Sequence, residues 1–97
     1  MTVNPLLLRY VKSFSTGRVR IRHPALKREN VVATVRENLA PVPGINSLEF
    51  NPLSGSVLIL YDSEKIGQQR LLATGAAWAE YLDSVQAGQP LPVPEAR

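Results

Sequence analysis

Residues 17–24, GRVRIRHP, place an arginine at every second position from Arg18 through Arg20 to Arg22. Side chains alternate between the two faces of a β-strand, so this pattern predicts a strand with three guanidinium groups on one face and apolar residues on the other. Like charges on one sheet face repel each other unless an anion lies near them. We therefore expect acidic side chains of this chain, a partner or a phosphate-rich ligand beside the three arginines.

The segment after this strand predicts a helix. After the strand expected at 18–23, apolar residues recur at spacings of four over residues 27–39 and form a stripe on one helix face. Residues 40–44, APVPG, end that helix because proline cannot continue it and glycine suits a turn.

Two more strands and a second helix complete the pattern. Strands are expected at 45–50 and 56–61, joined by the turn-forming residues NPLSG. The second of them, SVLILY, is apolar on both faces, which is typical of a central strand. Asp62 or Ser63 is expected to cap a long helix that reaches about Gln86.

The order strand, helix, strand, strand, helix predicts an α+β fold of the ferredoxin-like βαββα type, without the last strand of the split unit. Right-handed crossovers place the first and third of these strands side by side, with both helices on one face of an antiparallel or mixed sheet. The N-terminal segment is a candidate for the fourth, edge strand: residues 10–14, a turn at 15–17 and the arginine strand form a hairpin. Its three-residue loop would place Lys12 opposite Arg20.

A helix is the alternative for the same N-terminal segment. Asn4 is a good N-cap before Pro5, and Leu7, Val11 and Phe14 would line one face of such a helix. The sequence leaves strand and helix open for residues 5–14.

The composition fits one small domain. A chain of 97 residues with 44% hydrophobic and 20% charged residues buries a single modest core, which we expect to comprise residues 1–86, followed by a Pro-rich flexible tail at 87–97. There is no cysteine, which excludes disulfides, thiolate metal sites, iron–sulfur clusters and cysteine nucleophiles. Three consecutive leucines near the start are too few for a signal peptide or a membrane span, so we expect a cytoplasmic protein.

Charge is divided unevenly along the chain. Residues 1–36 hold eight Lys and Arg against one acid, whereas residues 37–97 hold three against seven. The two halves can compensate each other, pair with a second copy as a homodimer, or recruit an acidic partner through the basic half. No paired carboxylates, phosphate-cradling glycine loop or nucleophile beside a base is present, so we expect a protein that is not an enzyme.

Together, GRVRIRHPAL (17–26), the valine-rich helix and PGINSLEFNPLSGSVLILYD (43–62) resemble the heavy-metal-associated domains. The sequence is most similar to a divergent, cysteine-less branch related to N-terminal domains of heavy-metal-transporting P-type ATPases. The resemblance covers residues 17–66 and implies a ferredoxin-like fold.

In that family the loop after the first strand carries CxxC, whose thiolates hold soft metals. Here the loop reads HPALKR, residues 23–28, so the metal function does not transfer residue by residue. The resemblance implies instead a non-catalytic accessory or docking module of heavy-metal handling, with iron among the candidate metals. A metal-transporting ATPase or a metal-storage compartment is the candidate partner.

Two kinds of side chain are candidates for partner binding. Arg18, Arg20 and Arg22 would supply electrostatic docking. Leu58 and Leu60, on the outer face of the strand at 56–61, would supply an apolar patch with a charged rim.

Phosphate binding by the arginine strand, with Arg9 and Lys12 beside it, is an alternative function. Sheets that bind RNA stack bases on exposed aromatic residues of their central strands. The central strand here offers leucines instead, so we expect no nucleic-acid partner.

His23 is the only histidine and the only candidate metal ligand in the loop where the family binds metal. A single imidazole gives at best a weak site for a divalent metal, because selective sites use three or four ligands. Glu29 is a candidate second ligand, but Lys27 and Arg28 would repel a cation. The alternative is a half-buried residue at the edge of the core or a turn residue before Pro24, and we expect no tightly bound cofactor.

Overall fold

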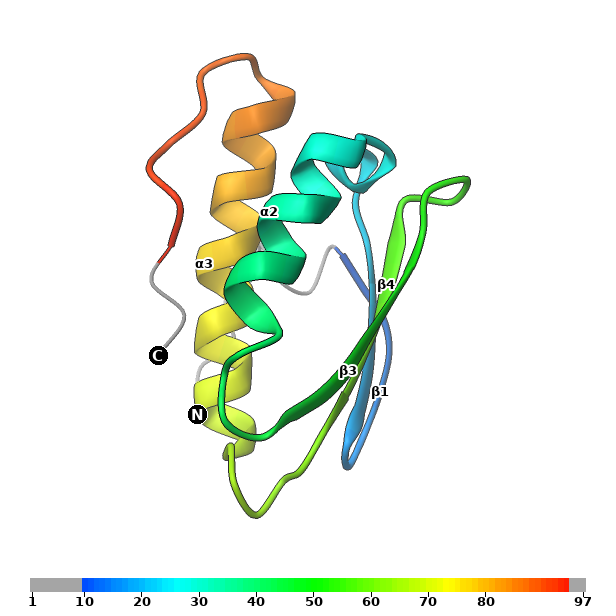
Figure 1. Cartoon of the computed structure of the whole chain (residues 1–97), viewed down its shortest axis with the longest axis vertical. Helices are drawn as coiled ribbons and strands as arrows, with labels where there is room; N and C mark the ends of the chain where they lie inside the picture. Colours follow the sequence, from blue (N-terminus) through cyan, green and yellow to red (C-terminus); the bar gives the residue numbers. More distant parts are fainter. Residues whose placement is uncertain (1–9, 95–97) are drawn as a thin grey trace.

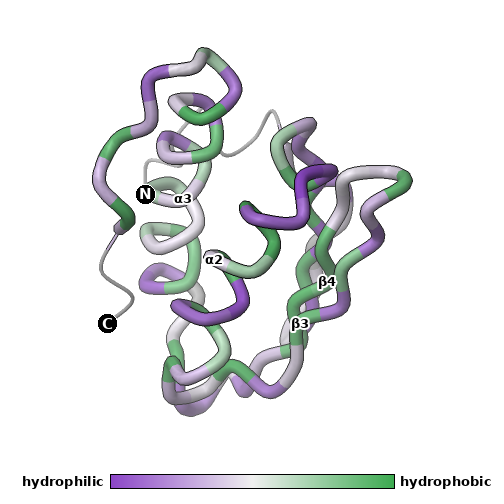
Figure 2. Tube along the Cα trace, turned by 45° about the horizontal axis from the view of Figure 1, so that its top comes forward, coloured by the Kyte–Doolittle hydropathy of each residue, from purple (hydrophilic) through white to green (hydrophobic). Residues whose placement is uncertain are grey.

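The protein is built from two layers, a four-stranded antiparallel sheet and a pair of helices on one of its faces (Figure 1). The computed structural model describes residues 10–94. In chain order the elements are β1 (Val11–Ser15), β2 (Arg18–Arg22), the 3-10 helix η1 (Pro24–Lys27), α2 (Glu29–Leu39), β3 (Ile45–Asn51), β4 (Ser56–Tyr61) and α3 (Gln68–Gln86). A second view again shows α2 and α3 on one side of the strands (Figure 2). The predicted α+β, ferredoxin-like fold is confirmed.

The sheet order is β1-β2-β4-β3, and each of the three strand pairs is antiparallel. The sheet is therefore antiparallel throughout and not mixed. β2 and β4, the first and third strands expected from the crossover rule, are neighbours at the centre. β4 lies between β2 and β3 at the centre of the sheet, and its inward-facing Val57 and Ile59 are buried in the core.

The N-terminal segment forms the edge strand. β1 pairs with β2 and fills the position left by the missing last strand of the ferredoxin-like unit. The alternative helix is therefore wrong for Val11–Phe14, although Tyr10 is helical and residues 5–9 lie outside the described residues. Gly17, with φ of +83°, takes the left-handed conformation that closes the hairpin.

The register of this hairpin differs from the prediction. Ser15 pairs with Arg18 and Ser13 with Arg20, and a bulge at Lys12 follows before Val11 pairs with Ile21. The expected pairing of Lys12 with Arg20 is wrong because the connecting turn is one residue shorter than expected. The bulge and the shorter turn place a serine opposite the arginine and so avoid a like-charge pair.

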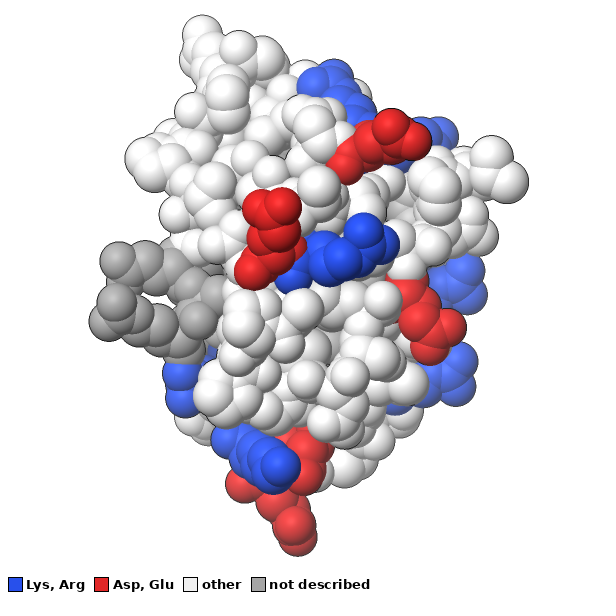
Figure 3. Space-filling view, in the orientation of Figure 1, with Lys and Arg blue, Asp and Glu red and all other residues white. Residues whose placement is uncertain are grey.

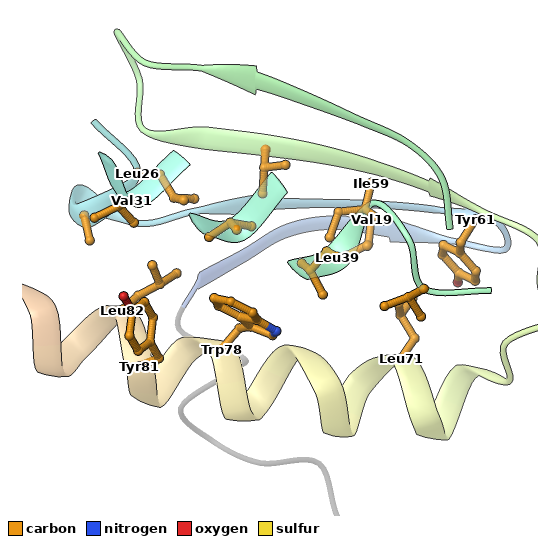
Figure 4. Close-up of a cluster of buried hydrophobic side chains, with 14 of the residues drawn as sticks. Val19, Leu26, Val31, Leu39, Ile59, Tyr61, Leu71, Trp78, Tyr81 and Leu82 are labelled. Atoms are coloured by element: carbon orange, nitrogen blue, oxygen red, sulfur yellow. The ribbon is translucent and has the colours of Figure 1, made fainter. Parts of the chain in front are cut away.

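The core lies between the inner face of the sheet and the two helices. Val19 and Ile59 point from the sheet toward Leu39 of α2 and Trp78 of α3 (Figure 4). Leu48 and Phe50 of β3 share this inner face and pack against the core. The predicted valine stripe of α2 is buried as well: Val31, Val35 and Leu39.

The start of the long helix differs from the prediction. α3 begins after Gly67, so the expected cap at Asp62 or Ser63 is wrong, whereas the predicted end at Gln86 is confirmed. Asp62 instead stabilises a turn, in which its Oδ1 accepts a hydrogen bond from the Glu64 backbone N–H at 2.9 Å. The chain turns here because Ile66, which is almost fully buried, must reach the core before the helix begins.

The described part of the tail, residues 87–94, lies beside α3 on the side away from the sheet (Figures 1 and 2). The backbone N–H groups of Gln89 and Leu91 donate to the carbonyl and hydroxyl oxygens of Ser84, both at 3.0 Å. Residues 87–94 therefore do not cover the outer face of the sheet. Neither α2 nor α3 has the combination of length and apolar composition needed to span a bilayer, over the residues described.

Substitution of Gly55 tests the contact that holds the loop after β2. The His23 backbone N–H donates to the Gly55 carbonyl at 2.8 Å, and a Cβ on Gly55 would lie 2.7 Å from the His23 carbonyl oxygen. Gly88 has a similar positive φ, but a Cβ there would meet nothing within 4 Å. We expect Gly88→Ala to lower the free energy of unfolding by about 1 kcal/mol through backbone strain alone. Gly55→Ala should lower it by about 1–3 kcal/mol more through overpacking.

Urea unfolding of both variants, followed by circular dichroism, measures this difference. Equal losses for the two glycines would show that Gly55 and His23 do not approach each other closely.

Candidate functional site

The outer face of the sheet brings together the residues that the sequence singled out for partner binding. Val19 is buried against the helices, so the arginines on either side of it in β2 are exposed on the opposite face. Arg18 lies directly opposite Leu60 of β4, and Arg20 lies opposite Leu58. Both leucines are half-buried in spite of facing away from the core. We call Arg18, Arg20, Arg22, Leu58 and Leu60 the outer face.

The basic row on the outer face has little local compensation. Among residues 10–94, no carboxylate lies within ion-pair distance of Arg18, Arg20 or Arg22. Glu49 of β3 is opposite Leu58 and thus two strands away from Arg20, roughly 10 Å across the sheet. Lys and Arg side chains are visible along the sheet side of the molecule, at the right of the space-filling view (Figure 3). The three arginines are therefore available to an external anion.

His23 lies on the opposite side of the sheet from the outer face, where it is buried next to α3. Only 1% of its surface is exposed, so it is buried and not half-buried as expected. Its Nδ1 accepts a hydrogen bond from the Ala25 backbone N–H at 3.0 Å and so caps η1. Its Nε2 lies 2.9 Å from Oδ1 of Asp83 in α3, and the Tyr10 hydroxyl donates to the same oxygen. The Tyr10 and His23 rings are also in contact, with centroids 4.4 Å apart.

These contacts define the tautomer of the imidazole. Nδ1 accepts from a backbone N–H and therefore carries no proton, so the proton that bonds to Asp83 is on Nε2. Both ring nitrogens thus have partners within the fold. Glu29, the candidate second ligand, opens α2 and is exposed. Over residues 10–94, no three His, Cys, Asp or Glu side chains are grouped as a metal ion would require.

Sequence reasoning missed Tyr10 and Asp83, the two partners of His23. Asp83 is 60 residues away along the chain and resembles an ordinary solvated acid of a helix. No spacing rule connects it to His23, because their meeting depends on how α3 packs against η1. The loop after β2, residues 23–28, is therefore held by a hydrogen-bonded Tyr10–Asp83–His23 group.

Comparison with known protein families adds an independent finding. Residues 8–79 match the family model described as heavy metal associated domain 2. The match extends from just before β1 into α3, and so includes the edge strand as well as the segments that carry the resemblance in the sequence. No curated protein and no solved structure matches the chain.

Removal of the Asp83 carboxylate tests the hydrogen-bonded group. Asp83→Ala leaves the buried Nε2–H of His23 without its acceptor, and we expect a loss of about 1–3 kcal/mol in the free energy of unfolding. Asp83→Asn keeps an oxygen that can accept this bond, so its loss should be smaller, about 1 kcal/mol. Glu80→Ala removes the same charge from an exposed position of α3 and should change stability by less than about 0.5 kcal/mol.

Chemical denaturation of the three variants and the unchanged protein checks the order. If Asp83→Ala were as harmless as Glu80→Ala, the contact with His23 would be without energetic importance.

Proposed function

Because the chain belongs to the heavy metal associated domain 2 family, we propose that it is a non-catalytic accessory module of heavy-metal handling that acts by docking to a protein through its outer face. Membership of the family implies a role associated with metals, and domains of this kind are in general not enzymes. In this chain the functional surface is then the outer face of the sheet, and not the loop at residues 23–28.

The observation that carries the proposal is the unpaired arginine row beside two leucines. Arg18, Arg20 and Arg22 are exposed, and no carboxylate of residues 10–94 pairs with them. Leu58 and Leu60 lie beside them on the neighbouring strand. An apolar centre with an arginine rim is the composition of protein interfaces, in which arginine is enriched because its planar fork makes two hydrogen bonds to a carboxylate.

The loop after β2 supports the same proposal, because it is poorly suited to hold a metal itself. It has no cysteine, and the nitrogens of its only histidine are engaged by Ala25 and Asp83. A metal that reached His23 would have to displace one of these partners from a buried ring, in a loop that also carries Lys27 and Arg28. A metal-associated role is then more readily performed by contact with another protein that holds the metal.

The chemistry of the outer face describes the partner. It should present carboxylates to the arginine row and an apolar side chain to the leucines. A metal-transporting ATPase and a metal-storage compartment are the candidates, with iron among the metals, and we place the encounter in the cytoplasm. A second copy of the chain fits this face only through its acidic half. Two outer faces placed together would bring two arginine rows into contact, and these would repel each other.

Replacement of the arginine row tests the docking role. We expect the triple variant Arg18→Ser, Arg20→Ser, Arg22→Ser to bind the partner about tenfold or more weakly, since three exposed ion pairs of roughly 0.5–1 kcal/mol each are lost together. The control Lys27→Ser, Arg28→Ser, Lys65→Ser removes the same charge from positions outside the outer face. Affinity capture from the native cytoplasm, with quantitative mass spectrometry, compares the three proteins.

The result that supports docking is a metal-transport or metal-storage protein captured by the unchanged chain and by the control, but not by the arginine variant. Equal capture by both variants would remove the outer face from the mechanism.

A further inference from the structure

One end of the outer face is hollowed into a pocket with a uniform chemistry. The pocket has a volume of about 270 Å³ and lies where β1, the end of β2 and the β3–β4 turn meet. Its lining consists of three basic and three hydroxyl side chains: Lys12, Arg20, Arg22, Ser13, Ser54 and Ser56. No acidic and no aromatic residue of the described chain is among them.

Local structure explains how these side chains come together. The bulge in β1 interrupts the pairing between Val11 and Ser13 and gives Lys12 a position that regular alternation would not give it. Ser13 lies opposite Arg20, and Ser56 lies opposite Arg22 on the other side of β2. The lining is thus contributed by three neighbouring strands and the turn that follows Asn51.

Two hydrogen bonds orient the lining before any ligand arrives. Arg22 Nε donates to the Ser54 carbonyl at 3.1 Å, which fixes the guanidinium plane and leaves its terminal N–H groups for another acceptor. The hydroxyls of Ser54 and Ser56 lie 2.7 Å apart, so one of them donates to the other. Ser56 is buried, which limits the motion of this pair.

We propose that this pocket binds a phosphate monoester, with Lys12, Arg20 and Arg22 neutralising its charge, and with Ser13 and one hydroxyl of the Ser54–Ser56 pair donating to its oxygens. Two guanidinium groups make paired hydrogen bonds to phosphate oxygens, and the ammonium adds a point charge. A phosphate monoester carries about two negative charges and three acceptor oxygens at neutral pH. A carboxylate, with one charge and two oxygens, leaves two of the three cations uncompensated, whereas the monoester leaves about one.

The pocket does not fit a nucleic-acid strand as a whole. Proteins that bind single strands stack the bases on aromatic side chains, and the lining offers none. The phosphoryl group itself is therefore the feature recognised. It can belong to a small metabolite or to a phosphorylated side chain of a protein, and the two sources share the chemistry of the pocket.

This inference rests on the proposed function, because a phosphorylated partner would bring its phosphate to one end of the same docking face. It is nevertheless separable from it. Arg18, Leu58 and Leu60 belong to the outer face but do not line the pocket. Docking can thus occur without phosphate, and phosphate can bind without a docked partner.

The test is a titration of the nitrogen-15-labelled chain of 97 residues with inorganic phosphate, monitored by proton–nitrogen NMR at constant ionic strength. We expect saturable shifts of the amides of Lys12, Ser13, Arg22, Ser54 and Ser56. Acetate at the same ionic strength should leave them in place. Pocket substitutions Lys12→Gln and Arg22→Gln should each raise the Kd about tenfold, which corresponds to the loss of one charged hydrogen bond.

Arg18→Gln is the matched control, because it removes the same charge from the same strand and the same face outside the pocket. It should change the Kd less than about twofold, as expected for an exposed charge that makes no contact. Arg22→Gln also removes the hydrogen bond to Ser54 and can disturb the turn. Lys12→Gln therefore serves as the second pocket variant, in which this hydrogen bond is kept. Equal effects of Arg18→Gln and Lys12→Gln, or equal shifts with acetate, would overturn the pocket in favour of diffuse attraction to the basic face.

A phosphoserine peptide with acidic flanks, and the same peptide without phosphate, identify the source of the phosphoryl group. Binding of the phosphopeptide at least tenfold tighter than inorganic phosphate assigns it to a protein partner. Equal affinities assign it to a free phosphate ester. Leu58→Ser with Leu60→Ser should leave the Kd for phosphate unchanged while weakening partner capture, so a failure of either proposal is visible without the other.

Discussion

The rest of the structure depends on the alternation of side chains in β2. Val19 must be buried against the helices, and this requirement alone sends Arg18, Arg20 and Arg22 to the opposite face. A shift of one residue in the pairing of β2 with β4 would bury guanidinium groups in an apolar core, which is far more costly than any local rearrangement. The register of the central strands, the closed core and the basic outer face are therefore consequences of one constraint.

Because the constraint is local, much of the fold is predictable from sequence. The alternation in β2, the valine stripe of α2 and the apolar run of β4 each indicate their element directly, and their order leads to the sheet topology. What the sequence does not show depends on contacts between distant segments. The start of α3 is delayed because Ile66 is needed in the core, and Lys12 leaves the regular ladder at a bulge that no residue type marks.

The candidate site shows the same division. The neighbourhood of the arginines and the outer leucines follows from strand alternation and from the pairing of β2 with β4, and the structure brings them together. The surroundings of His23 do not follow from any pattern, because Asp83 arrives from a helix 60 residues later and Tyr10 from the segment before β1. In a family defined by metal association, the loop without cysteine is thus stabilised by hydrogen bonds to its histidine, and the exposed chemistry lies on the sheet.

We propose that the exposed sheet, and not the loop at His23, is the functional surface. It is tested most directly by proton–nitrogen NMR of the zinc-free protein during addition of zinc, copper(I) and ferrous iron. We expect the amides of residues 23–29 to keep their positions at millimolar metal, because both nitrogens of His23 are already hydrogen-bonded, to Ala25 and Asp83. Saturable shifts confined to residues 23–29, with displacement of the His23 ring from Asp83, would contradict it and make the loop a rebuilt metal site.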